Sequence, residues 1–248
     1  LDQIMDSITA GMEEYNLKPF FFTPLRSEAA IRYRQEVMRD LEGEILFKRI
    51  QAFARSIYEI ATRMQHICEH LAQPESYTCN YLEKGRLLNS ASIYCDEVKS
   101  LARDIVSMDL KSCGLSAFRE YLSSYAESDV FTALQAETNA MKAELRNVHY
   151  CMLIKDSCIK VRKYENEPDH TPEIERLFQK FRQGAVKDYR KKIPEEPYAE
   201  HVEAGVLNLV AKLYPDIFTN LDRYCASNRG FMNETIYTFS REIQFYIA

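Results

Sequence analysis

The chain has 248 residues and a formal net charge of −5, which is not the overall balance of a nucleic-acid-binding protein. Seven glycines and eight prolines are few for this length, so long regular elements are expected. Residues with β-branched side chains rarely cluster, which favours a mainly all-α fold. No apolar run approaches the length of a membrane span, so no membrane partner is expected.

The seven cysteines form no C-x-x-C motif, and several lie within apolar helical patterns. Cysteine in such a pattern acts as a small hydrophobe, and we expect a reducing, cytoplasmic location. Because Leu1 is not a methionine and the chain stops inside the apolar pattern of residues 243–247, we expect the sequence to be part of a longer protein.

An aromatic cluster, Phe20 to Phe22, precedes the first well-defined helix and is too apolar for a solvated loop. Pro24 restricts Thr23 to extended geometry, so a turn is expected there, and Ser27 is placed to cap the helix that follows. We define the structural joint as this turn and the apolar face of its helix, and we expect the other helices to pack around it. Its residues are Phe22, Pro24, Leu25, Ile31, Arg34, Val37 and Leu41.

The strongest periodic signal consists of two heptad seams, in which apolar residues recur at alternating steps of four and three. Seams of this kind are typical of paired helices. Because a short polar link separates two seams of similar length, a long antiparallel helical hairpin is expected. The first seam is Leu46, Ile50, Phe53, Ile57, Ile60, Met64, Ile67 and Leu71, and the second is Leu87, Ala91, Tyr94, Val98, Leu101, Ile105 and Met108.

The chain after the second seam predicts further helices and one β element. A corner at residues 111–116 precedes helices at about 117–125 and 129–146. Residues 148–154 and 158–161 are rich in residues that favour strands, and the residues between them are suited to a hairpin turn. A small β-hairpin is therefore expected. Helices are expected again from about 199, with a kink at Pro215 and a final helix capped by Asn233.

A basic helix is expected at about residues 171–192, where seven basic residues stand against two acidic ones from Glu175 to Lys192. Such a helix fits non-specific contact with DNA phosphates, although a charged stripe is also typical of an ordinary solvated face. The candidates for contact with the DNA backbone are Arg176, Lys180, Lys187, Arg190 and Lys191.

Other motifs give no catalytic or metal site. His66 to His70 fits H-x-x-E-H, but both histidines flank the first heptad seam and no third ligand can be named, so no metal is expected. The glycines are isolated, so no phosphate-binding loop exists and no cofactor is expected in this chain. No Ser-His-Asp or Cys-His grouping stands out, and we expect the chain by itself not to be an enzyme.

The joint, from Phe22-x-Pro24-Leu25 through Ile31, Arg34, Val37 and Leu41, resembles the start of the helical core of MutS-family mismatch-repair ATPases. The strings Phe181 to Tyr189 and Phe239 to Tyr246 are similar to a MutS-related subgroup. Phe118-Arg119-Glu120 matches the Phe-x-Glu of that family's mismatch wedge. It falls inside a predicted helix well after the core begins, so we expect Phe118 to be a core residue.

The resemblance implies a core-domain-like fragment in three parts. These are a helical core and lever at 1–146, a reduced clamp-like insertion at 147–196 with the β-hairpin and basic helix, and returning core helices at 197–248. It implies a DNA partner, a homodimeric parent protein, and ATP with Mg bound beyond residue 248. The alternative is a helical scaffold that binds a protein partner and no nucleic acid.

Overall fold

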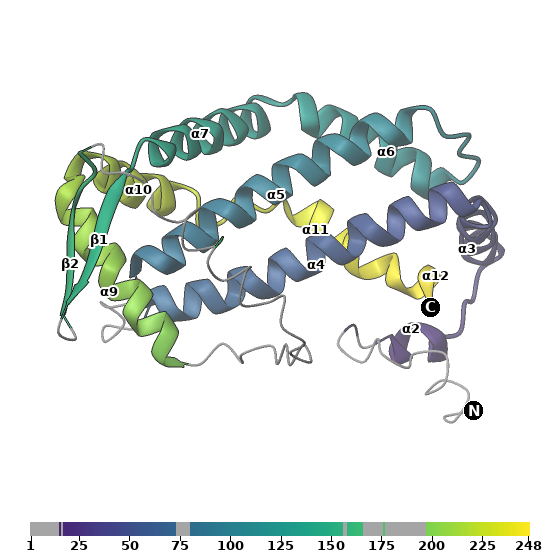
Figure 1. Ribbon diagram of the computed structural model, residues 1–248. Helices are drawn as coiled ribbons and strands as arrows, with labels where there is room; N and C mark the ends of the chain where they lie inside the picture. Colours follow the sequence, from purple (N-terminus) through teal and green to yellow (C-terminus); the bar gives the residue numbers. More distant parts are fainter. Residues whose placement is uncertain (1–14, 16, 73–79, 156–157, 166–175, 177–196) are drawn as a thin grey trace.

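The computed structural model describes residues 15, 17–72, 80–155, 158–165, 176 and 197–248 (Figure 1). These residues are mainly helical and contain one two-stranded antiparallel sheet, which confirms the expected all-α fold with a small β-hairpin. Among the described residues, no helix is both long and apolar enough to cross a membrane.

Two long helices, α4 (Glu44–Ala72) and α5 (Asn80–Val106), form the expected antiparallel hairpin (Figure 1). The first seven residues of the first heptad seam are buried, and Leu71 is partly buried. In the second seam the first six residues are buried, and Met108 is partly buried. Both seams are therefore confirmed as the contact between the two helices, and the link at residues 73–79 lies outside the described residues.

The remaining helices pack around this α4–α5 hairpin. Helices α6 (Cys113–Glu127), α7 (Asp129–Arg146), α9 (Pro197–Leu213) and α10 (Pro215–Ser227) contact α5, whereas α11 (Glu234–Glu242) and α12 (Gln244–Ile247) contact α4. Helix α5 is therefore enclosed on most sides. It has small buried residues where its neighbours approach, namely Ser90, Ala91, Ser92, Cys95 and Ala102.

Local signals in the sequence set most helix starts. The Ser27 and Asn233 side chains accept hydrogen bonds from the third helical N–H of α3 (Glu28–Leu41) and α11, which confirms both expected caps. Helix α7 has the expected bounds, whereas α6 begins at Cys113, earlier than expected. The reason is Ser112, whose Oγ accepts from the Leu115 N–H and starts the helix where the sequence predicts a corner.

The β-hairpin pairs β1 (Tyr150–Lys155) with β2 (Cys158–Lys163) in an antiparallel register that places Tyr150 opposite Lys163 and Lys155 opposite Cys158. The face of β2 that contains Ile159 and Val161 packs against the core, and β2 contacts α9. The opposite face contains Lys160, which is exposed.

The joint lies at one end of the molecule, where α2 (Lys18–Phe22) leads into α3 (Figure 1). Val37 and Leu41 are buried, but Phe22 is 44% exposed and Ile31 is 42% exposed. The expectation that the other helices pack around the joint is therefore wrong, since they surround the α4–α5 hairpin. Apolar composition alone does not tell whether a neighbouring segment covers a residue.

Replacing Ile57 or Leu101 by Ala should lower the free energy of unfolding by about 2–5 kcal/mol. Both side chains are fully buried in the heptad seams, so each truncation leaves a cavity. Urea unfolding of each variant measures the effect. Ile45→Ala is the control, because Ile45 is on the same helix and 80% exposed, and its change should stay within about 0.5 kcal/mol. Equal losses of unfolding free energy in the Ile57→Ala and Ile45→Ala variants would contradict the packing of the heptad seams.

Candidate functional site

The candidates for DNA contact lie mostly outside the described residues. Arg176 is described and is exposed, while Lys180, Lys187, Arg190 and Lys191 are not described. Their role stays a prediction. The described elements that precede and follow this segment, β2 and α9, contact one another at the end of the molecule opposite the joint (Figure 1).

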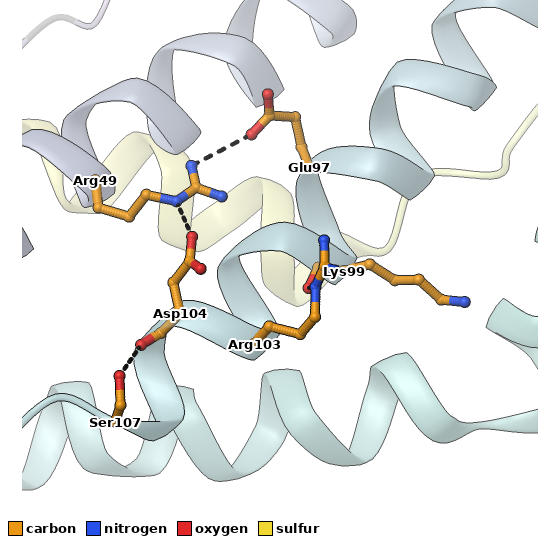
Figure 2. A network of polar contacts seen from close by, with 6 residues as sticks. All are labelled: Arg49, Glu97, Lys99, Arg103, Asp104 and Ser107. Atoms are coloured by element: carbon orange, nitrogen blue, oxygen red, sulfur yellow. Dashed lines mark hydrogen bonds and ion pairs between the residues drawn. The ribbon is translucent and has the colours of Figure 1, made fainter.

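A polar network that the sequence analysis missed joins the two long helices near the joint end. Figure 2 shows Arg49 of α4 reaching two carboxylates of α5. The Arg49 Nε donates to Asp104 Oδ2 at 2.6 Å, and its Nη1 donates to Glu97 Oε2 at 3.5 Å. The Arg49 side chain is 20% exposed, so solvent screens this network less than a surface ion pair.

Heptad positions explain why these three residues meet. With Ile50 and Val98 at position a of their seams, Arg49, Glu97 and Asp104 each occupy position g, directly beside the seam. In an antiparallel pair, g residues of one helix lie beside g residues of the other, and charges there help to set orientation. The opposite charges at position g of the two seams were therefore the sequence signal that could have predicted this network.

The joint is fixed to α6 by the carboxylate of Asp40 in α3. The backbone N–H of Ser112 donates to Asp40 Oδ2 at 2.8 Å, and the Lys111 N–H lies 3.1 Å from both carboxylate oxygens. Burial alone would raise the pKa of Asp40, but the hydrogen bonds from Ser112 and Lys111 outweigh it and hold the pKa below its ordinary value of 3.8. Asp40 therefore binds the loop before α6 in its ionised form.

The joint also contacts the C-terminal helix. The Arg34 guanidinium lies over the ring of Phe245, 4.6 Å from its centroid, and Phe21 approaches the same ring at 4.7 Å. Among the joint residues, Arg34 and Val37 thus lie near α12 and α11, whereas Phe22 and Pro24 are exposed. The structure therefore brings together only part of the joint.

A buried hydroxyl network holds α11 against α5 and α6. Tyr94 Oη accepts from the Asn233 N–H at 3.1 Å and donates to Tyr125 Oη at 3.2 Å, while Tyr121 donates to Asn233 Oδ1 at 2.9 Å. Burial, with the Tyr125 hydrogen bond, raises the pKa of Tyr94, so the phenol stays neutral. Phe118 is buried and stacks on Phe239 with ring centroids 3.4 Å apart, so its expected core position is confirmed.

Two of the described cysteines, Cys95 and Cys225, are buried. Burial raises the pKa of the Cys95 thiol to about 11 and that of Cys225 to about 12, so neither forms the thiolate that a nucleophile needs near neutral pH. In the part of the chain that the structure describes, no three metal-ligating side chains come together. The Nδ1 of His70 lies 3.5 Å from Glu83, and His66 is exposed.

Reversing the charge of Arg49 should destabilise the α4–α5 hairpin, because three negative charges would then meet beside the seam. We expect Arg49→Glu to lower the free energy of unfolding, and Arg49→Glu with Asp104→Arg to restore part of it. A double-mutant cycle measured by urea unfolding should give a coupling of about 0.5–3 kcal/mol. The matched control is Arg55 and Glu59, an exposed pair on α4, for which a coupling of at most about 0.5 kcal/mol is expected.

Replacing Asp40 by Asn should lower stability by about 1 kcal/mol at pH 6, since the charged acceptor is lost at a site partly open to solvent. The folded pKa of Asp40 is below its unfolded value near 3.8, so its contribution is present above that value and is lost as pH falls through the folded pKa. The difference between wild type and Asp40→Asn should therefore shrink from pH 6 to pH 3 in urea unfolding. A difference that grew at low pH would show that Asp40 is not a stabilising carboxylate.

The chain was compared with protein-family models, curated proteins and solved structures. No family model, curated protein or solved structure matches it.

Proposed function

We propose that this chain is the core and lever of a MutS-like DNA-binding ATPase, and that it couples DNA contact at one end to a nucleotide-bound domain beyond the other. The observation that carries this proposal is the pair of continuous helices in the α4–α5 hairpin, with 29 residues in α4 and 27 in α5. A packed helix pair moves as a rigid body, which is what transmission between two distant sites requires.

The arrangement of the ends supports this proposal. The hairpin runs from the joint and α12, where the described chain ends, to β1, β2 and α9 at the opposite end (Figure 1). The predicted basic helix connects β2 and α9 in the sequence. A nucleotide domain joined after α12 would thus lie at the opposite end of the α4–α5 hairpin from β2 and α9, the two elements that the predicted basic helix connects.

The charge at the β-hairpin end also favours contact with phosphate. Strand β2 carries Lys160, Arg162 and Lys163 within six residues, just before the basic segment. Lys160 and Lys163 are exposed, and Lys163 lies over the ring of Tyr214, 5.1 Å from its centroid. Cations on a fixed scaffold without base-reading groups are what non-specific backbone contact needs.

The nucleotide part of the proposal comes from the resemblance. No phosphate loop occurs in this sequence, so ATP and Mg would be bound by another part of the parent protein, which we propose to be a cytoplasmic homodimer. The chain itself would transmit movement between the DNA and the nucleotide domain and would not catalyse ATP hydrolysis.

A protein scaffold is the second candidate, and a specific observation favours it. Five large apolar side chains within residues 20–38 are 39–46% exposed. A group of exposed apolar residues of this kind is typical of a protein-binding surface. These residues are Phe20, Phe22, Ile31, Tyr33 and Met38.

The two candidates differ in how the chain should respond to salt and to charge. If the basic helix contacts phosphate, replacing Lys180 and Lys187 together by Gln should weaken binding to any duplex sequence. The slope of log affinity against log salt should become smaller by about two, because each lysine releases about one counterion. Fluorescence anisotropy with two labelled duplexes of unrelated sequence measures both quantities.

The matched control is Lys48→Gln with Arg63→Gln, two exposed residues of α4. This variant loses the same formal charge, so it separates local contact from an effect of net charge. An unchanged slope in the Lys180 and Lys187 variant, or an equal change in the control, would contradict DNA contact by this helix. If the wild-type chain shows no measurable DNA binding, the protein scaffold becomes the better-supported function.

A further inference from the structure

A cavity of about 220 Å³ lies at the joint end, between α3, the start of α6, and α11 with α12. Five aromatic rings and the guanidinium of Arg34 line it. The rings are Phe20, Tyr33, Phe239, Phe245 and Tyr246. An aromatic-walled cavity with a few convergent polar groups is the usual form of a small-molecule site.

The cavity is shaped by a close approach at Gly114. A Cβ atom at Gly114 would lie only 2.4 Å from the Tyr33 hydroxyl, so any larger residue would displace that ring. Phe245 is 8% exposed and Tyr33 is 46% exposed, so the cavity has a covered wall and a side open to solvent. An engineered apolar cavity of about 150 Å³ holds benzene, so this one has room for a single ring with a small substituent.

Arg34 gives the cavity its chemical preference. Its guanidinium lies on Phe245, and its Nη1 donates one long hydrogen bond, 3.5 Å, to the Phe20 carbonyl oxygen. Within the described part of the chain, no carboxylate lies within ion-pair distance of it. A half-buried guanidinium with donors to spare favours a planar anion, which it binds through two parallel hydrogen bonds.

The other polar side chains that line the cavity are compatible with a bound anion. Burial first, and then Tyr33, raise the pKa of Tyr246, so this phenol is neutral near pH 7 and adds no negative charge. Glu242 also lines the cavity, but it is exposed, so solvent screens its repulsion.

We propose that this cavity binds a small aromatic carboxylate, with the ring between Phe245, Tyr246 and their neighbours and the carboxylate on Arg34. Aromatic walls favour a planar ring by stacked or edge contacts. A neutral ring would leave the Arg34 guanidinium without an anion, and a non-aromatic acid would lose the contacts with the aromatic walls. The proposal does not depend on DNA contact, because the cavity lies at the opposite end of the α4–α5 hairpin from β2 and α9, the described elements that flank the basic segment in the sequence.

The test is a titration of the full chain, labelled with ¹³C at methyl groups, with benzoate up to about 10 mM, which detects millimolar dissociation constants. The methyl signals of Val37, Leu115 and Ile243, which line the cavity, should shift, whereas those of the exposed Val130 should not. Benzamide has the same shape without the charge, and cyclohexanecarboxylate has the charge without the aromatic ring. Each should bind at least about 10-fold more weakly than benzoate.

Replacing Arg34 by Gln should weaken benzoate binding about 10- to 100-fold, as expected for loss of a charged hydrogen-bonding partner. Arg39→Gln, an exposed arginine of the same helix, is the matched control and should leave the dissociation constant unchanged. Arg34→Lys keeps the charge without the planar fork and should give an intermediate value. No shift of the cavity methyl signals in the wild type, or equal binding by the Arg34→Gln and Arg39→Gln variants, would overturn the proposal.

Discussion

The contact between the two heptad seams is the constraint on which the rest of the structure depends. Helix α5 meets α4 along one face and α6, α7, α9 and α10 along others, so its register decides where these four later helices lie. The seam residues Ile50, Phe53 and Ile57 on α4 are fully buried, as are Val98 and Leu101 on α5. Close packing of this kind tolerates little slippage, because each side chain fills a space that its neighbours define.

Polar contacts within and beside this core select one arrangement among similar ones. Arg49 pairs with carboxylates across the seam, and Thr138 shares a 2.8 Å hydrogen bond with Tyr224 between α7 and α10. Apolar seams alone accept shifts of one heptad, whereas the hydrogen bond between Thr138 and Tyr224 would be lost if α7 and α10 shifted relative to one another. Tyr94 acts in the same way for α11, since its hydroxyl meets the backbone of Asn233.

The sequence predicted the elements that depend on local period and capping, and it failed where distant segments decide. The seams, the β-hairpin and the Asn233 cap follow from residue spacing and short-range chemistry. The exposure of Phe22 and Ile31 depends on which helices arrive from elsewhere in the chain. The cavity beside Arg34 is formed by three segments that are far apart in the sequence, at residues 20–37, 114–115 and 239–246, so no local pattern could have predicted it.

The α4–α5 hairpin and the joint differ in how they are held, and this difference bears on the proposed coupling. The hairpin itself is held by fully buried apolar side chains, whereas the joint is held by Asp40, by Arg34 on Phe245 and by half-exposed aromatic rings. Segments with few buried apolar contacts and solvent-accessible hydrogen bonds open at lower free energy than a packed core. A movement transmitted through this chain would therefore bend at the joint while α4 and α5 move together. The strength of the coupling would then depend on the contacts of Asp40 and Arg34.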